Sequence, residues 1–204
     1  MLQAAPQKKK AADSYDVKIN PSTSGLLARS PIIFSTKSQT IMAQIKDLRD
    51  LLCHEVQALY SAENLITAGL PRMIENASSP ELKQAFQTHL SETESQIERL
   101  EEVADILEVD PDGDKNVGMA GIIAEGEKVM HKDATPEALD AALICAAQKV
   151  EHYEIAGYGT AVYLAQELGF ESAARILESI LDEEKKTNEI LNSLAKNLVN
   201  PMAE

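Results

Sequence analysis

Apolar side chains recur at helical spacing along most of this 204-residue chain, beginning near Ile41. Residues three and four apart lie on one face of an α-helix, so this spacing predicts helices that bury one face. Gly69 and Pro71 predict a kink or an interruption near the end of the first helix, because proline lacks a backbone donor. The apolar stripe of this helix is Ile45, Leu48, Leu52, Val56, Leu59, Ile66 and Leu70.

A second long helix is predicted to begin in the segment SSPELKQAF. Ser79 is a favoured N-cap residue, and Pro80 suits the first helical position because a donor there has no helical partner. The segment VDPDGDKNVG is rich in turn-forming residues and predicts the end of this helix. Its expected apolar stripe is Leu82, Phe86, Leu90, Ile97, Leu100 and Ala104.

Two more helices are predicted before Gly169. A short one covers residues 118–131 and is too short to span a bundle of this size. Thr135 and Pro136 repeat the capping pattern and start a third long helix, which runs to Leu168. Gly169 adopts left-handed backbone angles without strain, so it is expected to stop the helix.

The last long helix is predicted from Glu171 to Asn197. Alternating Val, Ile and Thr segments, which would predict strands, are missing. Four long helices, with one short helix between the second and the third, indicate an all-α, antiparallel four-helix bundle over residues 41–200.

Residues 1–40 differ from the rest of the chain. They mix Pro, Ser and Thr with short apolar patches such as Ile32-Ile33-Phe34, and they show no helical period. We therefore expect an N-terminal arm outside the core that is either flexible or docked on a partner.

The formal charge is unevenly distributed. Residues 1–40 hold six Lys and Arg against two Asp, a charge of +4, so the rest of the chain carries −18, for a total of −14. A body this acidic repels phosphate backbones and anionic membranes, and we expect no nucleic-acid or membrane partner. It suits metal cations better, although most acidic surface side chains simply face solvent.

Cys53 and Cys145 are the only cysteines, and both fall in predicted helices. Two cysteines make no disulfide framework, so we expect small buried thiols in a protein of the reducing cytoplasm. No apolar run reaches the ~18 to 20 residues of a membrane span. No continuous apolar stretch of about 7 residues follows the N-terminal lysines, so we expect no secretory signal.

The segment AQKVEHYEIAGYGT places carboxylates where the helical pattern calls for apolar residues. Glu151 and Glu154 share one face with Ala147 and Tyr158, because the spacings are four, three and four. Leu143 and Val162 extend that face in both directions, which makes it the buried one. Gly157 and Gly159 follow, and we expect them to allow close approach of a neighbouring helix.

Each of the other long helices also directs polar side chains toward the core. They are Glu63 on the first helix, His89, Glu92 and Gln96 on the second, and Glu184 with Asn188 on the last. An ionised carboxylate in an apolar interior costs several kcal/mol unless it is paired or binds metal. Lys and Arg partners fall off these faces, so a cation is the simplest compensation. Considered alone, Glu151 and Glu154 more often mark a solvated helix face, and His89 and His152 are more often ordinary semi-buried histidines.

Four segments together resemble the YciF-type family of ferritin-like bacterial stress proteins. They are LYSAENL, HLSETESQIERLE, AALICAAQKVEHYEIAGYGT and LDEEKKTNEIL, and the resemblance covers about residues 41–197. It implies a ferritin-like bundle related to rubrerythrin, a tendency to dimerise, and a centre of two iron ions or manganese. The N-terminal arm is not part of the common pattern.

The resemblance also implies a ligand set. Carried over by position, the ligands are Glu63, Glu92, Glu151, Glu154 and Glu184, with His89 or Gln96 completing the contribution of the second helix. Two departures from the wider ferritin-like pattern stand out: the usual Glu-x-x-His order is reversed at His89, and Asn188 stands where related sites offer His. The site is therefore expected to be rich in oxygen and poor in nitrogen, which suits iron or manganese.

Two functional hypotheses follow. In the first, the protein is a stress-response di-iron carboxylate protein that binds Fe(II) in the bundle core and oxidises it with O₂ or peroxide, as a ferroxidase-like or peroxidase-like oxidoreductase. In the alternative, it is a non-enzymatic dimeric stress or scaffold bundle with a structural or vestigial metal site. Mineral storage in a shell ranks last. In each case we expect a homodimer or a larger homo-oligomer, assisted by the N-terminal arm.

Overall fold

The computed structural model describes residues 45–204. The expected N-terminal arm and the predicted helix start at Ile41 lie outside the described residues. The described part of the chain is helical and contains no strand, so the all-α prediction is confirmed. Its helices are α1 (Leu48–Asn76), α2 (Pro80–Leu107), α3 (Val117–Met130), α4 (Pro136–Glu167) and α5 (Glu171–Leu194), followed by a π-helical segment (Ala195–Val199) and the single turn α6 (Asn200–Met202).

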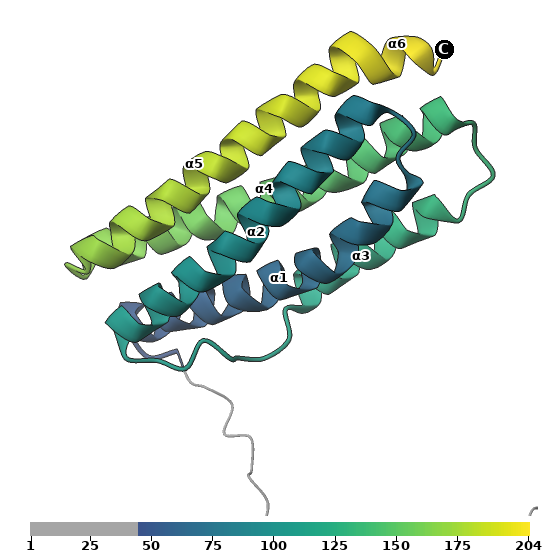
Figure 1. The fold of residues 1–204 in the computed structure, drawn as a ribbon. Helices are drawn as coiled ribbons and strands as arrows, with labels where there is room; N and C mark the ends of the chain where they lie inside the picture. Colours follow the sequence, from purple (N-terminus) through teal and green to yellow (C-terminus); the bar gives the residue numbers. More distant parts are fainter. Residues whose placement is uncertain (1–44) are drawn as a thin grey trace, which may run out of the picture. The chain divides into compact units, whose positions relative to one another are not determined.

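The four long helices α1, α2, α4 and α5 form the bundle (Figure 1). Each packs against two neighbours, in the ring order α1, α2, α5, α4, and neighbouring helices run antiparallel. The connection from α2 to α4 returns along the length of the bundle and contains α3, which lies against α4 and α1. This is the predicted four-helix bundle with one short extra helix.

The predicted helix caps are present. The hydroxyl of Ser79 accepts a hydrogen bond from the backbone N–H of Leu82 at 3.2 Å, and Thr135 caps α4 in the same way. Each cap satisfies one of the donors that a helix start leaves without a helical partner. Gly169 has φ +77°, as expected of a left-handed residue between α4 and α5.

The start of α1 differs from the prediction. Asp47 is the N-cap residue, and its carboxylate accepts from the backbone N–H of Asp50 at 2.8 Å. Ile45 and Leu48, the first two positions of the predicted stripe, are 52% and 46% exposed. The buried stripe therefore begins only at Leu52, because the chain before it extends beyond the end of the bundle core.

A kink or an interruption was predicted at Gly69 and Pro71. The interruption is wrong, because α1 continues to Asn76, and the kink stays a prediction. A proline removes one backbone hydrogen bond, which does not end a helix whose neighbouring turns are packed in the core. Leu70 is buried immediately before the proline, and Ala77 is buried just beyond the helix end. Packing of the helix on both sides of Pro71 thus outweighs the tendency of proline to end a helix.

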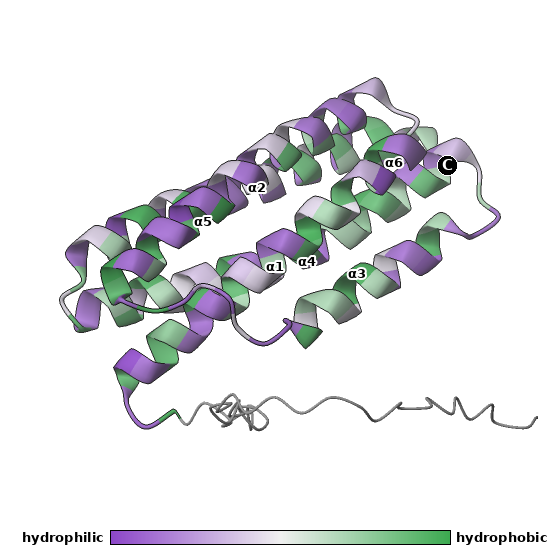
Figure 2. Cartoon of the chain, turned by 60° about the horizontal axis from the view of Figure 1, so that its bottom comes forward, coloured by the Kyte–Doolittle hydropathy of each residue, from purple (hydrophilic) through white to green (hydrophobic). Residues whose placement is uncertain are grey.

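Buried polar residues separate two apolar clusters in the core. One cluster contains Leu59, Leu100 and Tyr158, and the other contains Phe86 and Leu191. Every long helix crosses between the two clusters, and buried polar side chains lie at or near each crossing. Figure 2 shows the general pattern, in which the hydrophobic faces of the helices turn toward one another. The buried polar side chains of the crossings are Glu63, His89, Thr93, Gln96, Glu151, Glu154, Glu184 and Thr187.

The buried face of α2 is rotated relative to the predicted stripe. Leu90 and Ile97 are only half-buried, whereas His89, Thr93 and Gln96 are at most 3% exposed. The prediction placed His89 and Gln96 beside the apolar stripe, but they lie at its centre. The rotation is decided by packing against α1 and α5, which the sequence of α2 alone does not contain.

The expected close approach of a neighbouring helix is found at one of the two α4 glycines. A Cβ on Gly157 would come within 2.9 Å of Leu59 Cδ2, so the glycine allows α1 and α4 to approach closely. A Cβ on Gly159 would meet nothing within 4 Å. The expectation was therefore wrong for Gly159, which lies away from the α1 contact.

The cysteines are less buried than expected. Cys145 is exposed and Cys53 is half-buried, so the prediction of a buried thiol is wrong for Cys145. Burial raises the pKa of the Cys53 thiol, which keeps it protonated at neutral pH. Among the described residues, no helix is both long and apolar enough to span a membrane.

Candidate metal centre

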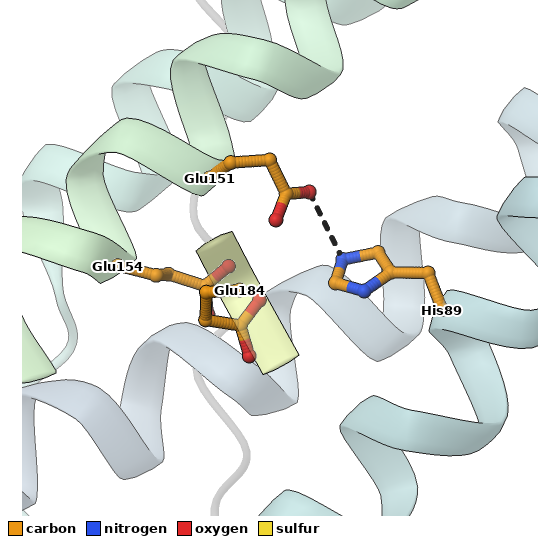
Figure 3. A group of neighbouring side chains, drawn as sticks. All are labelled: His89, Glu151, Glu154 and Glu184. Atoms are coloured by element: carbon orange, nitrogen blue, oxygen red, sulfur yellow. Dashed lines mark ion pairs between the residues drawn. The ribbon is translucent and has the colours of Figure 1, made fainter. Parts of the chain in front are cut away.

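Four side chains from three helices meet at the centre of the bundle. His89 comes from α2, Glu151 and Glu154 from α4, and Glu184 from α5, and they point toward one another (Figure 3). Each offers one ligand atom, and these atoms all lie within 4.8 Å of one another. We call these four residues the central cluster.

The local sequence explains why α4 contributes two carboxylates. Glu151 and Glu154 are one helical turn apart, and both lie on the face that buries Ala147 and Tyr158. Both glutamates are 0% exposed, so the face that the sequence indicated as buried is buried. His152, between them in sequence, faces solvent.

Most polar atoms of the central cluster lack hydrogen-bond partners. Among the described residues, no donor reaches either oxygen of Glu151 or Glu154, and both ring nitrogens of His89 are also without partners. The basic group beside these carboxylates is the imidazole of His89, whose Nε2 lies 3.4 Å from Glu151 Oε1 (dashed line in Figure 3). Buried polar groups are normally hydrogen-bonded, and one that is not costs about 1–3 kcal/mol, more if charged. The central cluster is therefore stable in the core only if its carboxylates bind protons or cations.

Burial and mutual repulsion raise the pKa values of these carboxyls. Burial, reinforced by the charges of Glu63 and Glu92, raises the pKa of Glu151 to about 8. The pKa values of Glu154 and Glu184 are also well above the usual range, again mainly through burial and then through neighbouring carboxylates. Burial lowers the pKa of His89 to about 4, so its imidazole is neutral and able to bind a metal ion.

Glu63 on α1 is a fifth buried carboxyl beside the central cluster. It is 0% exposed, and its Oε1 accepts a hydrogen bond from the Tyr158 hydroxyl. Burial raises its pKa to about 7, while the hydrogen bond from Tyr158 acts in the opposite direction. Its carboxyl interacts directly with that of Glu154. The charge of Glu63 raises the pKa of Glu154, whereas a hydrogen bond from the Glu154 carboxyl lowers the pKa of Glu63. With Glu63, all four long helices supply a buried side chain.

Gln96 contacts a cluster carboxylate through its amide nitrogen. Its Nε2 donates to Glu184 Oε1 and, at 3.1 Å, to Glu183 Oε2. Glu183 is held in turn by Arg99, whose Nη1 lies 3.1 Å from its Oε1. Gln96 therefore orients Glu184, while its own Oε1 is buried without a partner. A ligand role for Gln96 stays a prediction.

Glu92 lies outside the central cluster. It is half-buried and lines a groove between α2 and α5 together with Glu183. Its pKa is raised by burial and by the charge of Glu183. It is close enough for its charge to raise the pKa of Glu151, but its role as a ligand also stays a prediction.

Sequence reasoning missed Thr93, a buried polar residue beside the central cluster, and left Asn188 undecided as a ligand. Thr93 is 0% exposed and its Oγ1 has no hydrogen-bond partner among the described residues. Its spacing, four after His89 and three before Gln96, would have placed it on the same face. The Oδ1 atom of Asn188, one turn after Glu184, is also buried without a partner.

The donor set fits a divalent cation of intermediate hardness. Carboxylate oxygens with a neutral imidazole suit iron and manganese, whereas thiolate ligands for softer metals are lacking in the central cluster. A cation would occupy atoms that otherwise have no partner and would offset the charges that raise their pKa values.

The chain matches one family model and one curated relative over most of its length. The sequence model of the family described as "Domain of unknown function (DUF892)" matches residues 47–204. Protein YciF of Escherichia coli strain K12 is 44% identical over 161 residues, which is 78% of this chain and 97% of that protein. The chain belongs to this YciF-type family. The resemblance seen in the sequence is thereby confirmed.

Solved structures show the same helical fold. The crystal structure of the E. coli stress protein YciF matches with a TM-score of 0.74 at 43% identity, covering 76% of this chain and 99% of that one. YcfI from Rhodopseudomonas palustris, described as a candidate structural protein, matches with a TM-score of 0.72 at 42% identity, covering 76% and 97%. A Xanthomonas campestris protein at 22% identity, with a TM-score of 0.61, shares the fold.

Proposed function

We propose that this YciF-type protein is a ferritin-like di-metal carboxylate protein that binds Fe(II) in the bundle core. The observation that carries the proposal is the central cluster itself: four buried ligand groups within 4.8 Å, most of whose polar atoms have no partner in the described chain. Fixed donors on facing helices of a four-helix bundle are the arrangement by which carboxylate proteins hold two iron or manganese ions.

Charge supports two ions rather than one. Glu63, Glu151, Glu154 and Glu184 carry a charge of −4 when ionised, and no Lys or Arg among the described residues contacts them in an ion pair. Two divalent cations would balance that charge, whereas one would leave two buried carboxylates uncompensated. Glu63 would then complete the donor set from α1, with Glu92 as a further ligand at its edge.

The residues around the cluster have defined tasks in this proposal. When bound, the metal pair would supply electrons for the reduction of O₂ or peroxide. The Tyr158 hydroxyl holds Glu63, and the Gln96 amide holds Glu184. Apolar side chains on both sides of the polar residues limit the access of water to the ligands. Ligands that are fixed before the metal binds lose little conformational entropy on binding.

Anaerobic titration calorimetry of the metal-free full chain with Fe(II) tests the proposal. We expect about two ions per chain and the release of protons, because ligands with raised pKa values must deprotonate to bind. Glu154→Gln should abolish this binding, while Glu178→Gln, which removes an exposed carboxylate of α5, should leave it unchanged. Equal Fe(II) binding by the wild type and the Glu154 variant would refute the proposal.

The second candidate is a non-enzymatic structural bundle. The description of the R. palustris relative favours it, and so does a property of the site: the raised pKa values allow the carboxyls to remain protonated and neutral without a metal. This candidate predicts that Fe(II) and Mn(II) cause no proton release and no thermal stabilisation at neutral pH.

A further inference from the structure

A pocket lies between α1, α3 and α4 and ends at two residues of the central cluster, His89 and Glu151. Its volume is about 40 Å³. Its mouth carries Arg72 of α1 and Glu127 of α3, which form an ion pair and are both partly exposed. The pocket therefore connects the surface beside the extra helix with one side of the candidate metal centre.

The wall between the mouth and the inner end is apolar. Apart from Arg72, Glu127, His89 and Glu151 at the two ends, the lining residues are apolar or glycine. A buried water needs two to four polar partners, and cavities without them stay dry and accept apolar guests such as xenon. The middle of the pocket is consequently a poor site for water or for ions. Its larger lining residues include Ile66, Leu70, Ile122, Ile123, Leu143 and Val150.

Small residues at helix contacts create this space. A Cβ on Gly69 of α1 would lie 3.8 Å from Ile123 Cγ2, and a Cβ on Gly126 of α3 would lie 3.3 Å from Ala146 Cβ. Helix α3 buries only Met119, so it covers the pocket without filling it. The extra helix thus builds one wall of the pocket, which the four long helices alone would leave open.

We infer that this pocket binds a small apolar molecule of the size of dioxygen and brings it to the His89–Glu151 side of the central cluster. The volume selects for size, because about 10–15 Å³ holds one water-sized sphere, so ~40 Å³ holds a molecule of two or three atoms. The lining selects against hydrogen peroxide, whose two hydroxyl groups would lose their hydrogen bonds in the apolar middle. The use of dioxygen as oxidant rests on the proposed function, whereas binding of the small molecule does not.

Xenon is the probe for the pocket itself. In crystals of the metal-free full chain under xenon pressure, we expect xenon beside Ile123 and Leu143. The double variant Gly69→Ala/Gly126→Ala places two methyl groups in the pocket and should lower the xenon occupancy several-fold. The matched control is Gly121→Ala/Gly159→Ala, which adds the same methyl groups at helical positions where nothing lies within 4 Å. Absence of xenon from the wild-type pocket would overturn the inference, whether or not iron binds.

Oxidation kinetics test the connection to the cluster. Chains loaded with Fe(II) under anaerobic conditions are mixed with O₂ or, separately, with hydrogen peroxide. We expect the double pocket variant to react several-fold more slowly with O₂ than the control variant, and equally fast with peroxide, with Fe(II) affinity unchanged in both. An equal O₂ rate in the two variants would overturn the inference. If the wild type takes up xenon in the pocket but binds no Fe(II), the proposed function fails and the small-molecule site stands.

Discussion

Replacement of two cluster carboxylates should stabilise the metal-free protein. In Glu151→Gln/Glu184→Gln, the amides keep the size and polarity of the side chains but remove the groups that must either hold a proton or be ionised in the core. Without a metal, the wild type needs protons on these carboxyls, because burial raises the pKa of Glu151 to about 8 and that of Glu184 well above 4.5. Glutamine needs none.

The magnitude follows from the pKa of Glu151. At pH 7 the unfolded chain has ionised this group, whose usual pKa is 4.5, while the folded chain keeps it largely protonated. Because pH 7 lies about 2.5 pH units above 4.5, the cost to the free energy of unfolding is about 3 kcal/mol. In a domain of this length ~1 kcal/mol corresponds to ~2–4 °C, so the variant's Tm should rise by at least about 6 °C.

The sign of the pH dependence follows from the same groups. A folded pKa above the unfolded value means that the native state binds more protons, so stability is full below about pH 4.5 and falls as pH rises toward about 8. His89 acts in the opposite direction between about pH 4 and pH 6.5, because its folded pKa is lowered. The carboxyls outnumber it, so we expect a net loss of stability between pH 5 and pH 8.

Calorimetric melting of metal-free protein at several pH values is the assay. The variant should show a flatter dependence of Tm on pH, and it should lose the rise in Tm that Fe(II) gives the wild type through binding to the native state. The control Glu178→Gln/Glu189→Gln removes two exposed carboxylates of α5 and should change neither result. A variant that melts below the wild type, combined with a wild-type Tm that Fe(II) and Mn(II) leave unchanged, would show the carboxylates to be structural.

Three further outcomes are expected. Tyr158→Phe keeps the buried ring but removes the donor to Glu63, so chemical denaturation of the metal-free protein should show a loss of about 1–3 kcal/mol; no loss would mean that the hydrogen bond is dispensable. Gly157→Ala should lower the Tm, because its Cβ would meet Leu59 at 2.9 Å. Gly159→Ala, whose Cβ meets nothing within 4 Å, should raise the free energy of unfolding by ~0.5–1 kcal/mol through its higher helix propensity, and therefore raise the Tm. Equal effects of the two substitutions would contradict the close approach of α1 and α4. Light scattering of the full chain should give at least twice 22.2 kDa, and a monomer would refute this. Deletion of residues 1–38 should leave the bundle folded while changing the assembly, and an unchanged oligomeric state would refute the role of the arm.

The sequence by itself determined the helices and the chemistry that their buried faces carry. The caps at Ser79 and Thr135 and the stop at Gly169 were readable, because a cap depends on residues within one turn of it. Glu151 and Glu154 were readable as buried because they share the face of Ala147 and Tyr158. These features depend on residues within a few helical turns, so the local sequence is sufficient to predict them.

Tertiary structure decided which polar residues meet. The rotation of α2 brings His89 to the centre and leaves Glu92 at the edge, although the two are only three positions apart in sequence. The pocket against the cluster likewise depends on α3 lying over α1 and α4. These features arise from contacts between helices far apart in the chain, whose register is fixed by packing across the core. A single helical stripe does not contain that information.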